Sequence, residues 1–146
     1  MRKLLLSISL LSFLTLPSLR AQTKIDWQTL AGVTFSYIHN FEQNMWYGQP
    51  SYSEDIKALN GQEIIIKGYV LPTDIESNTY ILSANPFSSC FFCGGAGQES
   101  VMELRLKKKK AKFELDEVRT FAGKLRLNDQ EMELNYILEE ARVISE

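Results

Sequence analysis

The sequence predicts a mainly β protein: a small, five- to six-stranded barrel resembling the oligonucleotide/oligosaccharide-binding (OB) type, with an N-terminal aromatic arm and one or two short helices. Three observations support this fold class. Several segments alternate apolar and polar residues with the period of a strand. Two of the longest contain a glycine near the middle, Gly68 and Gly123, where a small barrel bends its strands. Few stretches have helical periodicity. A β-sandwich is the alternative architecture.

The N-terminus has the features of a leader. A basic pair, Arg2 and Lys3, precedes an apolar run over residues 4–16, and a small residue stands at Ala21. This order is typical of a secretory signal peptide over residues 1–21. The run is short and interrupted for a membrane span, and an uncleaved anchor is the alternative. We expect an exported protein, either periplasmic or at the cell surface or secreted, without stable membrane insertion after cleavage.

Cleavage after Ala21 would leave 125 residues with 13 basic and 18 acidic side chains, a net charge of −5. This length suits one domain with one core. We expect an arm with short helices over residues 22–60 and a β-barrel over residues 61–146. Nucleic acid is a poor candidate ligand, because its binding needs a basic surface.

Two short helices are expected in the arm. Asp26 can cap a helical turn that ends at Gly32, because its carboxylate can accept from free backbone N–H groups. Ser53 can cap a helix over residues 53–59 in the same way, and Asn60 and Gly61 would end it.

Between these helices, residues 33–37 alternate as a strand, and an aromatic segment follows over residues 41–52. We interpret that segment as an irregular arm that covers the open end of a sheet, since aromatic side chains usually serve burial. The alternative is a partner surface built from Trp46, Tyr47 and Tyr52.

Five barrel strands are expected after residue 61. Pro72 should end the first, and Asn128-Asp129 should turn the fourth into the last, which can continue through Ala141, Val143 and Ile144. The lysines at 107–110 and 112 suggest a solvated strand end, with a basic binding patch as the alternative. The expected strands cover residues 63–71, 79–83, 101–107, 118–127 and 131–137.

The segment over residues 85–97 contains both cysteines, Cys90 and Cys93, followed by Gly94, Gly95 and Gly97. Two nearby thiols in an exported protein can form a disulfide, which would fix the loop. A Cys-x-x-Cys turn followed by glycines also suits zinc, with two thiolates on one metal and backbone N–H groups donating to the sulfurs.

A structural zinc needs four ligands, and this pair supplies two. The others would come from His39, from a carboxylate such as Glu99, from a second copy of the chain in a homodimer, or from an acceptor protein. A thiol-disulfide enzyme is a further alternative, but the glycine run opposes the helix that would activate its first thiol. Haem attachment would need a histidine where Gly94 stands.

The segments around Ile25-Asp26-Trp27, Leu59-Asn60-Gly61 and residues 66–72, followed by the cysteine loop, resemble an uncharacterised family of small exported bacterial proteins, found especially in Bacteroidota. Its members have a Gly-Tyr-x-x-Pro strand before a Cys-x-x-Cys-Gly-Gly loop. The resemblance implies a periplasmic or surface-exposed barrel-like domain. Proteobacterial relatives of this type are associated with transporter genes for metal ions, but their cysteine loop is fuller than this one.

These observations lead to two expectations of function. The first is a non-enzymatic accessory factor in zinc handling or envelope assembly, which binds the metal through Cys90 and Cys93 and acts on an envelope protein or a transporter component. The second is an interaction module whose loop is locked by a disulfide and whose aromatic arm contacts a partner. His39 is the only histidine of the chain, and no carboxylate pair suggests acid–base catalysis.

Overall fold

The computed structural model describes residues 22–74, 79–108, 111–130 and 133–144. The signal peptide expected over residues 1–21 lies outside this part of the chain. None of the helices in the described part of the chain could span a bilayer.

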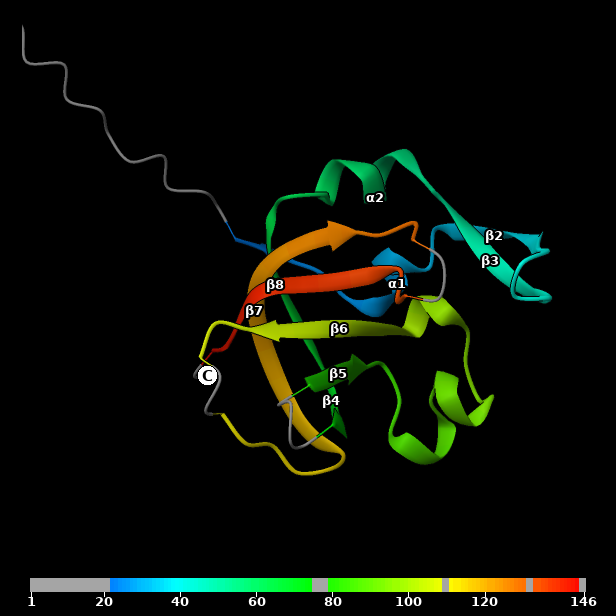
Figure 1. The fold of residues 1–146 in the computed structure, drawn as a ribbon. Helices are drawn as coiled ribbons and strands as arrows, with labels where there is room; N and C mark the ends of the chain where they lie inside the picture. The colour runs from blue at the N-terminus through cyan, green and yellow to red at the C-terminus, as the bar shows by residue number, and fades with distance from the viewer. Residues whose placement is uncertain (1–21, 75–78, 109–110, 131–132, 145–146) are drawn as a thin grey trace, which may run out of the picture.

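Five strands form a closed barrel of mixed direction (Figure 1). They are paired in the order β4-β5-β6-β8-β7, and a pairing between β7 and β4 closes the ring. β6 and β8 run parallel, whereas the other neighbours in the ring are antiparallel. This confirms the predicted mainly β, OB-like barrel. The barrel strands are β4 (Glu63–Asp74), β5 (Thr79–Ser83), β6 (Val101–Leu106), β7 (Glu117–Leu127) and β8 (Tyr136–Val143).

A short strand, β1 (Thr23–Lys24), lies outside the ring and pairs in parallel with β4. β4 itself belongs to both sides of the barrel, because it pairs with β7 over residues 63–70 and with β5 over residues 69–74. Gly68 lies where β5 begins to pair with the strand. A Cβ atom there would lie 2.6 Å from the carbonyl oxygen of Ser83 and 2.9 Å from Leu82 Cγ. Only glycine permits this approach, and β4 serves both sides of the barrel here, as predicted.

The second expected bend is confirmed in β7. Its register with β8 shifts between Ala122 and Lys124, and a Cβ on Gly123 would lie 2.7 Å from the carbonyl oxygen of Glu139.

Two expected strand ends are wrong. β4 continues past Pro72 to Asp74, because β7 flanks it only as far as Val70 and the proline faces β5 alone. β8 begins at Tyr136 rather than near residue 131 and ends at Val143. The turn expected at Asn128-Asp129 is part of a longer loop, which a backbone hydrogen bond of 2.9 Å from Asn128 to Asn135 closes. Residues 131–132 lie outside the described chain.

Both short helices are confirmed with their caps. Asp26 accepts from the backbone N–H of Thr29 at the start of α1 (Trp27–Leu30), and Ser53 accepts from Ile56 at the start of α2 (Glu54–Leu59). Between the helices, the strand expected over residues 33–37 is confirmed as part of β2 (Val33–Asn40), but residues 41–52 are not an irregular arm as expected, because they contain β3 (Met45–Tyr52). The two strands form an antiparallel hairpin that projects from the barrel (Figure 1).

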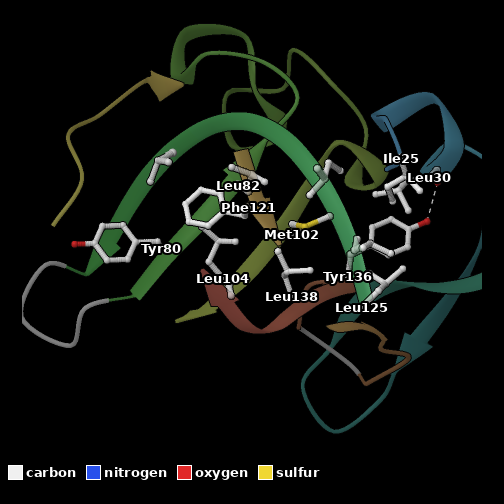
Figure 2. Close-up of a cluster of buried hydrophobic side chains, with 14 of the residues drawn as sticks. Ile25, Leu30, Tyr80, Leu82, Met102, Leu104, Phe121, Leu125, Tyr136 and Leu138 are labelled. Carbon is white, nitrogen blue, oxygen red and sulfur yellow. Dashed lines mark hydrogen bonds between the residues drawn. The ribbon is translucent and has the colours of Figure 1, made fainter. Parts of the chain in front are cut away.

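The main core fills the barrel and extends to the helices. Figure 2 shows aliphatic side chains from the strands around Phe121 and Met102, with Tyr136 at one end. Tyr136 is fully buried and its hydroxyl donates to the carbonyl oxygen of Leu30 at 2.7 Å, which ties α1 to the barrel. Burial of this apolar surface is the main force that closes the ring. Lys107 and Lys108 at the end of β6 are exposed, and residues 109–110 are not described.

Candidate functional site

The β2–β3 hairpin has one aromatic face. Because side chains alternate along a strand and the register pairs Tyr37 with Gly48 and His39 with Trp46, these residues share a face. Phe35 and Tyr52 lie further down the same face. The His39 ring stands edge-on between Phe41 and Trp46, at ring-centroid distances of 4.7 and 5.0 Å. The opposite face is mixed, with serine, threonine and glutamine among its residues.

Only the base of this face covers the core. Val33 is buried there, and Phe35 and Tyr52 pack against the main cluster. Further out the rings are in solvent: Tyr37 is 68% exposed and Trp46 is 67% exposed. The expectation that the aromatic arm covers the open end of a sheet therefore holds for the base of the hairpin alone.

Tyr52 has a structural role in holding the β7–β8 loop. Its hydroxyl donates to the carbonyl oxygens of Asn128 and Asn135, at 2.7 and 3.0 Å, and so holds the two ends of the β7–β8 loop. Burial raises the pKa of Tyr52 to about 12. Of the three residues expected to form a partner surface, Trp46 and Tyr47 line a groove, whereas Tyr52 supports the loop beside it.

The cysteine loop consists of three short 3-10 helices, η1 (Phe87–Ser89), η2 (Phe91–Cys93) and η3 (Gln98–Ser100). Cys90 is fully buried and packs in a small second cluster with Leu71, Ile81 and Val101, on the outer side of the strands. Cys90 thus anchors the loop as an apolar side chain.

Backbone hydrogen bonds close the loop around Cys90. Its carbonyl oxygen accepts from the N–H groups of Cys93 at 3.2 Å and Gly95 at 3.1 Å, and Gly94 donates to Phe91 at 2.9 Å. In a zinc-binding turn such N–H groups would donate to the sulfurs, but these three donate to carbonyl oxygens. The loop therefore has a fixed shape with both thiols free.

Cys93, unlike Cys90, is exposed. Loss of water around its sulfur raises the pKa of the Cys93 thiol, and the adjacent Cys90 thiol raises it further. A raised pKa keeps the thiol protonated at neutral pH. This is opposite to the lowered pKa of a catalytic thiolate.

The other predicted ligands do not join the pair. His39 lies on the hairpin between two aromatic rings, and Glu99 lies on η3 with its carboxylate against Gly97. Within the described chain, no group of three or more histidine, cysteine, aspartate or glutamate side chains could hold a metal ion. The two sulfurs would supply half of a zinc site.

A groove of about 450 Å³ runs between the hairpin and the cysteine loop. The hairpin approaches η3 closely, because a Cβ on Gly48 would lie 3.3 Å from Gln98 Nε2. In Figure 1 the hairpin and the segment between β5 and β6 project on the same side of the barrel. The lining residues are Tyr37, Met45, Trp46, Tyr47, Gly48, Ile81, Phe91, Phe92, Gln98, Gln130, Glu133 and Leu134.

Most residues that line the groove carry no signal in the sequence alone. Tyr37 could have been found, since strand alternation puts it on the same face as Trp46 once the hairpin register is known. Phe91 and Phe92 stand between the cysteines, where the Cys-x-x-Cys pattern assigns them no role of their own. Gln130 and Glu133 belong to the β7–β8 loop, and no local pattern links that loop to the hairpin.

Comparison with known proteins supports the fold. The chain is similar in structure to a DUF3299 family protein from Pseudomonas aeruginosa PAO1, with a TM-score of 0.54 and 15% sequence identity over 86% of this chain and 98% of that one. At this identity the similarity shows the fold alone. The predicted resemblance to an uncharacterised family of exported bacterial proteins is therefore supported only as far as this structural match. No family model and no curated protein matches the sequence.

Proposed function

We propose that the protein is an exported, non-enzymatic binding module, which holds its ligand in the groove between the β2–β3 hairpin and the Cys90–Cys93 loop. One observation carries this proposal. Exposed aromatic side chains from two segments far apart in sequence, Trp46 on the hairpin and Phe92 in the loop, line the same cavity. Solvent-exposed apolar side chains grouped in this way favour a binding surface over a role in stability.

The loop supports this role because it is fixed before any ligand arrives. Cys90 is buried under it, and backbone hydrogen bonds close it on both sides of the cysteine pair. A preformed wall reduces the conformational entropy that binding would otherwise cost. A Cys90–Cys93 disulfide, which an oxidising compartment favours, would restrict the loop further.

The geometry disfavours a thiol-disulfide enzyme. Cys93 lies at the end of a short 3-10 helix, not at the N-terminus of a long helix, and its pKa is raised. Both features reduce the fraction of reactive thiolate.

Zinc handling is the second candidate. The observation in its favour is that the two thiols lie side by side and that one of them, Cys93, faces solvent. An envelope protein, a transporter component or a second copy of the chain could complete the four ligands. Metal analysis of protein purified under reducing conditions tests this candidate. Equal zinc in the wild type and in a Cys90→Ser, Cys93→Ser double variant would exclude it.

The groove is tested by sedimentation with cell-envelope material from the source bacterium. We expect the wild type to sediment with the envelope and Trp46→Ala to lose at least about 1.4 kcal/mol of binding free energy, a tenfold effect. Phe41→Ala is the matched control, because Phe41 is 87% exposed on the same hairpin but does not line the groove. Equal retention of the wild type and Trp46→Ala would contradict the proposal.

A further inference from the structure

The groove has an unusual combination of side chains for a protein-binding surface. Its walls are aromatic, but its polar lining consists of amides and one carboxylate, from Gln98, Gln130 and Glu133. None of the described residues that line it is a lysine or an arginine. The groove therefore combines apolar ring faces with hydrogen-bonding groups and lacks positive charge.

Aromatic rings are available on the two walls. Tyr37 and Trp46 share one face of the hairpin, and both are about two-thirds exposed. Phe92, on the cysteine loop opposite, is also half exposed. The flat faces of such rings pack well against the C–H faces of sugar rings, while a tyrosine hydroxyl or a tryptophan N–H remains free to bond.

The polar groups are suited to hydroxyls. A carboxylate accepts hydrogen bonds, and an amide both donates and accepts, so together they can satisfy vicinal hydroxyls. Glu133 is already oriented, because its carboxylate accepts from Asn128 Nδ2 at 3.0 Å. Gln130 donates through Nε2 to Asp129 Oδ1 at 3.2 Å, and its amide oxygen is an acceptor group.

The position of the groove on the barrel also indicates the class of ligand. The groove includes Ile81 of the second barrel strand and residues of the loop between the fourth and fifth, β7–β8. OB barrels bind oligonucleotides and oligosaccharides on the face and loops that correspond to these. An oligonucleotide would bring phosphates next to Glu133, and none of the described lining residues is a lysine or an arginine that could neutralise them, so an uncharged chain fits better.

We infer that the groove binds an uncharged oligosaccharide, with sugar rings stacked on Trp46 and Tyr37 and hydroxyls bonded to Gln98, Gln130 and Glu133. This inference rests on the proposed function, because it names the ligand class of the same groove. A neutral glycan is a ligand that an exported protein would meet.

Isothermal titration calorimetry tests the inference. Protein expressed as the full chain is titrated with neutral hexasaccharides of glucose, mannose, galactose and N-acetylglucosamine, and with a thymidine decanucleotide as the anionic control. We expect at least one hexasaccharide to bind. Binding should weaken at least about tenfold in Trp46→Ala and in Tyr37→Ala. Phe41→Ala should bind as the wild type does.

Three results would overturn the inference: no binding of any hexasaccharide at about 5 mM, equal losses in Phe41→Ala and Trp46→Ala, or tighter binding of the oligonucleotide. Should the protein still sediment with the envelope in a Trp46-dependent manner while no sugar binds, the glycan inference fails and the proposed function stands. Loss of both signals would remove the proposed function as well.

Discussion

The barrel interior and the groove beside it both contain large apolar side chains, but they differ in what those side chains do. In the barrel, Phe121, Leu125 and Tyr136 are fully buried, and their packing closes the ring. In the groove, Tyr37 and Trp46 lie on an ordered hairpin and stay in solvent. The contrast indicates that Tyr37 and Trp46, unlike the aromatic residues at the base of the hairpin, contribute little to folding, which supports the proposed binding role.

The largest effect that tests this contrast is expected in the barrel wall. Gly68→Val should reduce the free energy of unfolding by about 3 kcal/mol or more, because its Cβ would meet the Ser83 carbonyl oxygen at 2.6 Å. Urea denaturation measures the change. Lys67→Ala, an exposed neighbour on β4, is the control and should change stability by less than about 0.5 kcal/mol. A mild effect at Gly68 would mean that the strand can move away from β5.

The two cysteines show the same difference within one loop, because Cys90 is buried and Cys93 is exposed. Cys90→Ser should reduce the free energy of unfolding by about 1–3 kcal/mol, because it buries a hydroxyl among Leu71, Ile81 and Val101. Cys93→Ser should change it by less than about 0.5 kcal/mol, since Cys93 is exposed. Both variants are measured under reducing conditions. Equal effects would show that Cys90 is not the anchor of the loop.

Tyr136 in the core and Tyr37 in the groove allow the two regions to be compared with the same residue type. Tyr136→Phe should cost about 1–2 kcal/mol of stability, because the buried carbonyl oxygen of Leu30 loses its donor. Tyr37→Phe should leave stability within about 0.5 kcal/mol of the wild type, because Tyr37 is on the exposed part of the hairpin. Thermal unfolding compares the two. Equal losses of stability in Tyr37→Phe and Tyr136→Phe would contradict the difference between groove and core.

A smaller effect is expected from Tyr52, which connects the two regions. Its phenol keeps its proton up to about pH 12 in the folded protein, whereas an unfolded tyrosine loses it near pH 10. Between these values the folded state binds more protons, so stability is complete below about pH 10 and falls as the pH rises. The fall over this window should be shallower in Tyr52→Phe. An unchanged slope in chemical denaturation would contradict this role.

Burial explains how much of the fold could be predicted from the sequence. Alternation of Met102 and Leu104 with charged neighbours indicated a half-buried strand, and glycines at 68 and 123 indicated the bends. The ends of the strands were harder to predict, because each end depends on which neighbouring strands and loops flank it. Pro72 is tolerated because only β5 flanks it, and the start of β8 depends on a loop that Tyr52 holds from another element.

The groove was less predictable because tertiary structure assembles it. The cysteine loop and the aromatic segment are both recognisable in the sequence, but the sequence pattern favours the aromatic segment as cover for the open end of a sheet. Trp46 comes together with Phe92 only through the pairing of the hairpin and the packing of Cys90 against the strands. Neither event has a local sequence signal, because both join residues far apart in the chain.

The comparison between barrel and groove is tested most directly by measuring stability and envelope retention on the same preparation of Trp46→Ala. We predict a free energy of unfolding within about 0.5 kcal/mol of the wild type, together with loss of sedimentation with the envelope. A variant that is destabilised by several kcal/mol, or one that sediments as well as the wild type, would contradict the claim that this aromatic face is kept for binding.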